Sequence, residues 1–193
     1  MLGLKLATDP RWVNIAEKTI DEILTDHAFC EQKAASTCIS LIVNYSEYEE
    51  MVEKVTPIVA EEWGHFRKVH KELKKRGFKL GINRNDTYVN QLRQFKTKGN
   101  TQIVRFIDDL LICAIIEARS CERFRLLSLH ISDENLRQFY HEFMVAEAGH
   151  YTLFIELAKS YYNPEYVKSR WQQLLDFEAE IMASLEYRGD RVH

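Results

Sequence analysis

The sequence contains few of the residues that interrupt regular structure. Only seven glycines and three prolines occur among 193 residues. Long stretches rich in Glu, Lys, Leu, Ala and Ile carry apolar residues at a spacing of three to four, which is typical of amphipathic helices. The chain is therefore predicted to be nearly all α and, at this length, to form a single domain over residues 1–193.

Cysteine is also scarce. The four cysteines, Cys30, Cys38, Cys113 and Cys121, show neither C-x-x-C spacing nor the density of a disulfide scaffold. A rubredoxin-type iron site and a zinc ribbon are therefore not encoded. We expect these thiols to be reduced and mostly buried.

Long apolar runs are absent, and so is the charged-then-apolar pattern of a signal peptide at residues 1–9. We therefore expect a cytoplasmic protein that does not associate with membranes. The net charge of −3 implies nothing about partners by itself.

Capping and turn residues divide the chain into helices. Asp9-Pro10 predicts a first helix, Ser46 with Glu49 forms a capping box, and Ser132 and Asn163-Pro164 precede two later helices. Gly77 is predicted to end the third helix. The predicted helices cover residues 10–25, 26–44, 46–77, 101–129, 132–161 and 164–189, and the connection 78–100 holds one short helix near 88–95.

Two stretches of the chain repeat one pattern, a glutamate followed after a gap by Glu-x-Gly-His and an aromatic residue. The first copy has Glu31 and then Glu62-Trp63-Gly64-His65-Phe66, and the second has Glu117 and then Glu147-Ala148-Gly149-His150-Tyr151. Residues three apart share a helix face, so each Glu-x-x-His directs a carboxylate and an imidazole to one point.

The lone glutamates join these pairs if each turn lies midway between the two glutamates of its copy. Ser46 lies at the midpoint of Glu31 and Glu62, and Ser132 lies at the midpoint of Glu117 and Glu147. Turn signals and ligand spacing therefore agree in both copies. One Glu-x-x-His alone arises often by chance, whereas two copies with glutamates at mirror distances are far more specific.

Two such helix pairs packed face to face give the four carboxylates and two imidazoles of a ferritin-like di-iron four-helix bundle. The fold prediction is this bundle with a long crossover at 78–100 and extra N- and C-terminal helices. Glu62 and Glu147 would bridge the two iron ions, and Glu31 and Glu117 would be terminal ligands. The predicted metal ligands are Glu31, Glu62, His65, Glu117, Glu147 and His150.

Three further residues lie beside the predicted ligands. His27, one turn before Glu31, is a supporting residue, an extra ligand or a hydrogen-bonded core histidine. Glu61 either orients the ring of His150 or is simply solvated. Cys121, one turn after Glu117, lines an oxygen pocket or packs in the core, and packing is the favoured interpretation.

Two segments resemble the signature segments of bacterial tRNA 2-methylthio-isopentenyladenosine hydroxylases, the MiaE family. They are residues 26–36, Asp-His-Ala-Phe-Cys-Glu-Gln-Lys-Ala-Ala-Ser, and residues 116–124, Ile-Glu-Ala-Arg-Ser-Cys-Glu-Arg-Phe. The similarity extends over essentially the whole chain. It includes Leu6-Ala7-Thr8, Arg76-Gly77 and Arg191-Val192-His193.

The resemblance implies an oxygen-dependent monooxygenase that hydroxylates the prenyl side chain of the hypermodified adenosine beside the anticodon. Its cofactor would be two iron ions, its co-substrate molecular oxygen and its partner tRNA. Because the chain has no cysteine-rich electron module, a ferredoxin-like or flavoprotein donor is implied. Two alternatives stay open: ferritin- or rubrerythrin-like iron oxidation or peroxide removal, and a helical module that only binds RNA.

Basic residues gather between residues 67 and 98, where eleven Lys or Arg face only Glu72 and Asp86, a local charge of +9. The rest of the chain carries −12. Such a face suits phosphate binding, with Phe78, Tyr88 and Phe95 available to stack on bases, although a solvated helix end has the same composition. The candidate tRNA contacts are Lys68, Lys71, Lys74, Lys75, Arg76, Lys79, Arg84, Arg93, Lys96 and Lys98.

Overall fold

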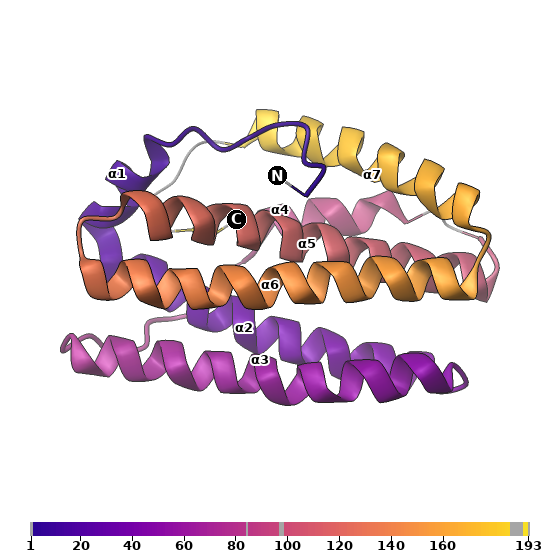
Figure 1. Cartoon of the computed structure of the whole chain (residues 1–193), viewed down its shortest axis with the longest axis horizontal. Helices are drawn as coiled ribbons and strands as arrows, with labels where there is room; N and C mark the ends of the chain where they lie inside the picture. Colours follow the sequence, from indigo (N-terminus) through magenta and orange to yellow (C-terminus); the bar gives the residue numbers. More distant parts are fainter. Residues whose placement is uncertain (1, 84, 97–98, 186–190, 193) are drawn as a thin grey trace. The chain divides into compact units, whose positions relative to one another are not determined.

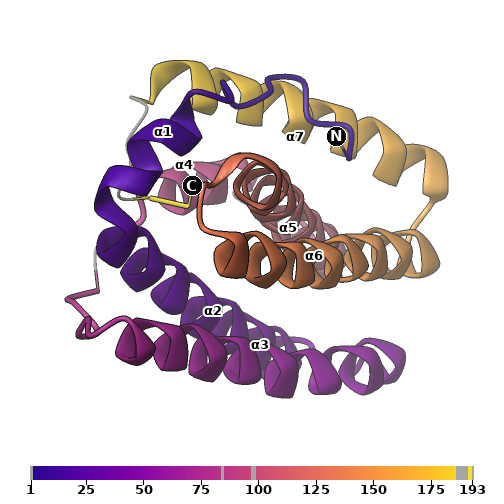
Figure 2. The same cartoon turned by 60° about the vertical axis from the view of Figure 1, so that its left-hand side comes forward.

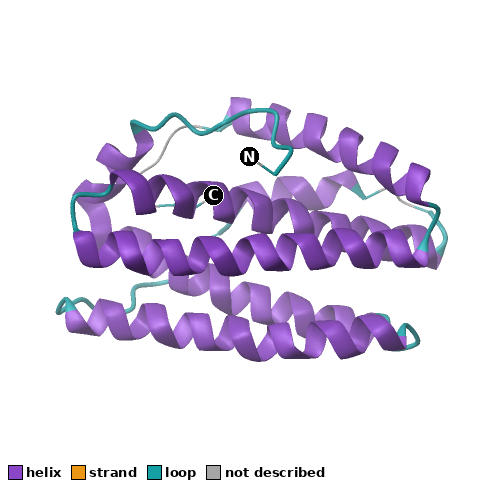
Figure 3. Cartoon of the chain, in the orientation of Figure 1, coloured by secondary structure: helices purple, strands orange, loops and turns teal. Residues whose placement is uncertain are grey.

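A computed structural model describes residues 2–83, 85–96, 99–185 and 191–192. All regular structure in these residues is helical, as predicted, and no strand occurs among them (Figures 1 and 3). None of the helices in the described part of the chain is both long and apolar enough to cross a membrane. The elements are α1 (Trp12–Ala16), the 3-10 turn η1 (Glu17–Thr19), α2 (Ile20–Asn44), α3 (Glu49–Lys75), α4 (Thr87–Leu92), the 3-10 turn η2 (Arg93–Phe95), α5 (Gln102–His130), α6 (Glu134–Tyr161) and α7 (Pro164–Ser184).

The chain divides into two compact units, each built on one long helix pair. The α2–α3 unit comprises residues 14–85 with residues 191–192, and the α5–α6 unit comprises residues 2–13 and 86–185. The single domain over residues 1–193 stays a prediction.

Helices α2 and α3 run side by side as a hairpin in the α2–α3 unit (Figures 1 and 2). Residues 23–28 of α2 are all buried, but from Ala28 to Leu41 the buried residues of α2 recur every three or four positions, so this part of the helix presents one stripe to α3. The stripe of α3 consists of Met51, Val55, Ile58, Val69 and Leu73, interrupted by the buried carboxylate of Glu62.

Gly77 ends α3, as predicted. Its φ of 78° lies in the left-handed region that favours glycine. The N–H of Gly77 donates to Lys74 O at 3.0 Å, and the N–H of Phe78 donates to Leu73 O at 2.9 Å. These two bonds form a Schellman motif, which satisfies carbonyls at the helix end.

Helices α5 and α6 form the hairpin of the α5–α6 unit, and α5 is buried along most of its length. The N-terminal segment runs beside α7 (Figures 1 and 2), where Lys5 pairs with Asp176. Further along this segment, Thr8 donates from its N–H and its hydroxyl to the Glu122 carboxylate on α5, both at 2.7 Å.

A buried arginine ties α5 to α7 and to the N-terminal segment. Arg119 is 0% exposed and donates to Oε1 of Glu178 at 2.9 and 2.6 Å, to Glu122 at 2.8 Å and to Leu6 O at 2.9 Å. The phenol of Tyr88 on α4 donates to the same Glu178 oxygen at 3.2 Å. Burial raises the pKa of Glu178, while the charge of Arg119 opposes that rise. The network therefore joins four segments around one guanidinium.

The predicted boundary between helices 10–25 and 26–44 is wrong. Helix α2 begins at Ile20 and continues through Thr25 and Asp26 without a break. The break falls at Thr19, whose φ of −136° and ψ of 50° are not helical. Asp26 caps no helix; its carboxylate accepts hydrogen bonds from Arg191 and Val192 at 2.9 and 2.8 Å.

Two predicted N-caps are also wrong by one or more residues. Ser46 lies in the turn, and α3 begins at Glu49, preceded by Tyr48 without a side-chain cap. Asp133, and not Ser132, caps α6, because its carboxylate accepts from the N–H groups of Asn135 and Leu136 at 2.9 and 3.1 Å. The aspartate accepts both bonds and complements the helix dipole.

The turns nevertheless lie where the ligand spacing requires. The α2–α3 turn between Asn44 and Glu49 is centred midway between Glu31 and Glu62. The α5–α6 turn between His130 and Glu134 is likewise centred midway between Glu117 and Glu147. In each hairpin the paired glutamates therefore come to the same level.

The remaining helix predictions agree closely with the structure. Helices α5 and α6 and the short helix near 88–95 match within one or two residues. Asn163 caps α7 ahead of Pro164, as expected. Helix α7 ends at Ser184, and the predicted end near Gly189 lies outside the described residues.

Candidate metal centre

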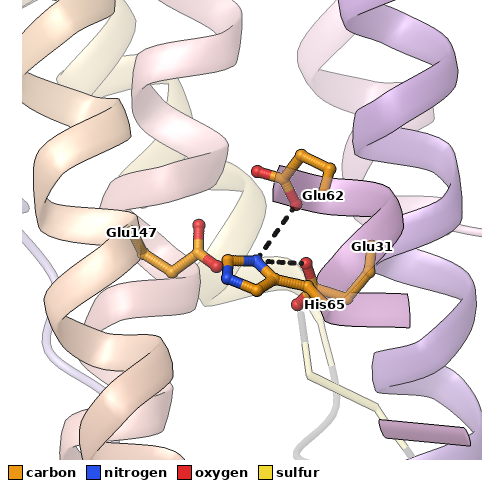
Figure 4. A group of neighbouring side chains, drawn as sticks. All are labelled: Glu31, Glu62, His65 and Glu147. Carbon is orange, nitrogen blue, oxygen red and sulfur yellow. Dashed lines mark ion pairs between the residues drawn. The ribbon is translucent and has the colours of Figure 1, made fainter. Parts of the chain in front are cut away.

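The α2–α3 hairpin brings three of the predicted ligands together, Glu31 from α2 and Glu62 and His65 from α3. Each offers a ligand atom within 4.8 Å of those of the other two. Nδ1 of His65 lies 3.4 Å from Oε2 of Glu31 and 3.6 Å from Oε2 of Glu62 (Figure 4). The two carboxylates are buried, at 4% and 1% exposure. We call these residues the α2–α3 half-site.

The α5–α6 hairpin brings together the other three, Glu117 from α5 and Glu147 and His150 from α6. Their ligand atoms also lie within 4.8 Å of one another, and all three residues are buried. Nδ1 of His150 lies 3.6 Å from Oε2 of Glu147, the distance that separates the corresponding atoms of His65 and Glu62. We call these residues the α5–α6 half-site.

The donor atoms of each half-site suit iron. Carboxylate oxygen and imidazole nitrogen are the ligands that carboxylate-rich di-iron sites use. Buried carboxylates close to one another also repel, so a bound cation stabilises the cluster. Each half-site thus fits the composition of a metal site on its own.

His27 makes direct contact with the α2–α3 half-site. Its side chain is 0% exposed, and Nε2 lies 2.7 Å from Oε1 of Glu31, one turn further along α2. Of the three interpretations open for His27, this geometry favours a buried histidine that hydrogen-bonds the ligand carboxylate. A bond of this kind fixes the orientation of a ligand and is a common feature of metal sites.

Glu61 lies beside a histidine of its own helix. Its carboxylate is 3.9 Å from Nε2 of His65, and its side chain is 49% exposed. The distance is too long for a hydrogen bond. Its predicted role in orienting His150 stays a prediction.

Cys121 is packed inside the α5–α6 hairpin. Its Sγ lies 3.3 Å from Met144 O, to which it donates, and the residue is 1% exposed. Burial, reinforced by the Glu147 carboxylate, raises the pKa of the thiol to about 12. Cys121 is therefore a buried, protonated thiol held against the α6 backbone, which favours the packing interpretation.

Arg119, two residues before Cys121, is a buried residue whose hydrogen-bond partners were not predicted from the sequence. The segment Ile116–Phe124 carried the family resemblance, but local spacing does not show that its arginine is buried with partners on two other segments, the N-terminal segment and α7. Its contacts fix the part of α5 that carries Glu117.

The candidate tRNA contacts differ in their exposure and in the ion pairs that they form. Lys68, Lys71, Lys74 and Lys79 are exposed, as is Arg93. Lys75 and Arg76 lie beside Glu72, at 3.7 and 2.7 Å, and Lys96 pairs with Asp109. Arg84 and Lys98 lie outside the described residues.

Two of the aromatic residues proposed to stack on bases have other partners. Tyr88 is 2% exposed and bonded to Glu178, so the prediction that it stacks on RNA is wrong. Phe95 packs between Phe177 and the guanidinium of Arg170, which lies 3.7 Å above its ring. Phe78 remains 36% exposed.

Comparison with known proteins identifies the family. The model of the family described as tRNA-(MS[2]IO[6]A)-hydroxylase (MiaE) matches residues 2–193. The chain belongs to the MiaE family. One curated relative is the tRNA 2-(methylsulfanyl)-N(6)-isopentenyladenosine(37) hydroxylase of Pseudomonas putida. It is 36% identical to this chain over 154 residues, which are 80% of this chain and 74% of the relative's own length.

The MiaE-family chain has two further relatives of note. The enzyme of the same name from Salmonella typhimurium is 26% identical over 94% of this chain and 84% of its own length. A solved structure, protein 43 with aldehyde deformylating oxygenase activity from Synechococcus, is 32% identical with a TM-score of 0.92, and the match covers 98% of this chain and 94% of that one. This likeness confirms the predicted ferritin-like all-α fold.

Proposed function

We propose that this chain is a di-iron monooxygenase that hydroxylates the prenyl side chain of the hypermodified adenosine next to the anticodon of tRNA. The observation that carries the proposal is the match of the MiaE family model along residues 2–193 of a chain whose two hairpins each assemble a Glu-Glu-His half-site. The same six residues are the ones that the sequence pattern singles out.

The two half-sites would hold two iron ions between them, with Glu62 and Glu147 bridging and Glu31 and Glu117 terminal. Two copies of one ligand pattern, with the same 3.6 Å separation of His Nδ1 and Glu Oε2, support this assignment. Bound iron would supply the activation of molecular oxygen. The four carboxylates would offset most of the charge of two divalent ions.

The residues around the ligands have a positioning role. The bond from His27 fixes the rotamer of Glu31, so that the carboxylate is ordered before metal arrives. In the other hairpin, Arg119 anchors α5 beside Glu117. Rigid ligand helices limit the reorganisation that metal binding requires.

The overall reaction requires electrons from outside the chain. One atom of molecular oxygen enters a C–H bond of the prenyl group to give C–O–H, and two electrons from the donor with two protons reduce the other atom to water. The four cysteines form no C-x-x-C pair or other cysteine-rich electron module, so a ferredoxin-like or flavoprotein donor is the proposed partner. With tRNA as substrate, the cytoplasm is the proposed compartment.

The decisive experiment is nucleoside mass spectrometry of tRNA from cells that contain or lack this protein. We expect the prenylated adenosine to gain one oxygen atom only when the protein is present. With purified protein, a reductant and isotopically labelled oxygen gas, the label should enter the product. Label arriving from water, or no change in tRNA, would contradict the proposal.

A second candidate follows from the Synechococcus protein, which is named for aldehyde deformylating oxygenase activity. Its 32% identity over nearly all of both chains favours testing this activity on the same iron-loaded sample. Loss of the formyl group from an aldehyde substrate, with tRNA unchanged, would assign the chain to that chemistry. Accumulation of thousands of irons per assembly would instead favour the ferritin-like alternative.

A further inference from the structure

Three ring side chains form a stack along one side of α3. The rings of Trp63 and Phe66 have centroids 4.9 Å apart and planes inclined by 23°. The rings of Phe66 and His70 follow at 6.0 Å and 16°. We call Trp63, Phe66 and His70 the α3 ring stack.

The ring stack lies outside the apolar core. Trp63 is 49% exposed, and Phe66 and His70 are partly exposed. Steps of three and four residues place the three rings on one side of the helix, next to the buried side that carries Glu62 and His65. A large indole is costly to leave in water, so a stack held open beside a ligand pair points to a partner.

The charges around the stack indicate which partner. Lys74 continues the same side of α3 by one more turn, and Arg67 and Lys71 lie close by on the helix surface; all three are exposed. Flat rings flanked by cations match the two features of single-stranded nucleic acid, bases with open π faces and phosphates between them.

We propose that the α3 ring stack binds unpaired bases of the tRNA anticodon loop, with Trp63 as the outermost platform and Arg67, Lys71 and Lys74 on the phosphates. The inference rests on the proposed function and extends it to a docking surface. Trp63 directly follows the ligand Glu62, so the platform lies on the same turn of α3 as that ligand, about 100° further around the helix axis. Stacking would hold the anticodon loop near the metal ligands of α3. The base-paired stems of the tRNA would make no stacking contact with the rings.

The test compares Trp63→Ala and Trp63→Phe with the matched control Val43→Ala, which removes a 70% exposed apolar side chain from α2. The probes are an anticodon stem-loop RNA and a blunt RNA duplex of equal length. We expect Trp63→Ala to raise the Kd for the stem-loop about tenfold and to leave duplex binding nearly unchanged. Trp63→Phe should retain most of the affinity, and Val43→Ala should match the parent.

Two readouts separate stacking from other roles of Trp63. Stem-loop binding should quench indole emission in the parent and not in Trp63→Phe. The salt dependence of Kd should keep its slope in Trp63→Ala, because the cations that meet the phosphates are unchanged. Iron content and helix content should equal those of the parent in all variants.

The outcomes distinguish this inference from the proposed function. A parent that hydroxylates tRNA, together with a Trp63→Ala variant of unchanged Kd for the stem-loop, would overturn the inference alone. If the Kd of Trp63→Ala for the stem-loop is unchanged but an electron-donor protein reduces the iron of this variant more slowly, the ring stack would be the docking surface for that donor. If stem-loop binding quenches Trp63 emission but the parent leaves tRNA unmodified, the ring stack is still an RNA-binding surface. The proposed hydroxylase function would then be contradicted.

Discussion

The backbone N–H of Val192 donates a hydrogen bond to Oδ2 of Asp26 at 2.8 Å and joins positions 166 residues apart in the chain. Arg191 donates to the other oxygen of the same carboxylate at 2.9 Å. Asp26 directly precedes His27, so the end of the described chain is fastened to the part of α2 that supports Glu31.

Replacing Asp26 with Asn should therefore lower the free energy of unfolding by about 1–3 kcal/mol, because charge-assisted bonds to a nearly buried carboxylate are weakened. Urea unfolding would measure it. The control is Glu50→Gln, which alters an exposed pair with Lys54 and should change stability by less than about 1 kcal/mol. Equal effects in the two variants would show that the bond with Val192 contributes nothing.

Replacing Glu62 with Gln should abolish binding of the full complement of two irons and should also stabilise the metal-free protein. Glu62 lies within 4.8 Å of the carboxylate of Glu31, and removing one of two buried like charges relieves repulsion. Metal analysis and thermal unfolding, with and without iron, would measure both effects. The matched control is Glu53→Gln on the exposed side of α3, which should load iron as the parent does.

Replacing His27 with Ala should weaken iron binding by about 10- to 100-fold while leaving the ligands in place, since the bond that orients Glu31 is removed. His27→Gln, which can still donate a hydrogen bond, should recover part of the affinity. Competition with a chelator would measure it. Replacing His141, which is exposed on α6, should have no effect, and equal affinity in His27→Ala would exclude the positioning role.

The thiols of Cys113 and Cys121 should resist alkylation in the folded protein. Burial raises the pKa of each to about 12, and the thiolate is the reactive form. At pH 8 the thiolate fraction is then about a thousandfold below that of a thiol with a pKa of about 9. Mass spectrometry after timed labelling should show the half-buried Cys30 modified first, and Cys121→Ser should still bind two irons. Early labelling of Cys121, or reduced iron content, would contradict the packing role.

Reversing the charges of Lys71 and Lys74 to Glu should raise the Kd for tRNA and reduce the slope of log Kd against log salt by roughly one unit for each phosphate that is no longer neutralised. Both residues are exposed on α3. The control applies the same charge change to Lys159 and Lys168, which are exposed on α6 and α7. If both double variants weaken tRNA binding equally, net charge and not this surface determines binding.

The ligand pattern could be predicted from sequence because it depends on local helix geometry. Glu-x-x-His needs only one turn of helix, and the mirror position of Glu31 needs only a turn at the right place. The predicted caps of α3 and α6 are wrong by two residues and one residue, and the turn centres are where they were predicted. A helix end shifts easily between Ser132 and Asp133, whereas the apolar stripes of the two helices fix the register of the hairpin.

The features that sequence reasoning missed depend on contacts between distant segments. Tyr88 has the composition of a base-stacking residue, but Glu178, 90 residues later, buries its phenol. The buried position of Arg119 follows from partners on two other segments, the N-terminal segment and α7. The α3 ring stack had a local signal, an aromatic residue three positions after Trp63, although only the exposure of Trp63 separates it from core packing.

The central position of each turn has a consequence for how these hairpins vary in length. A residue added to one arm alone would shift its glutamate by about 1.5 Å and 100° relative to the partner arm, which would separate the carboxylates. Additions within the turn, or matched additions of whole turns to both arms, leave the ligands level. Relatives of this chain are therefore expected to lengthen or shorten at the tips of α2–α3 and α5–α6, and an enzyme engineer can graft new loops there without rebuilding the iron ligands.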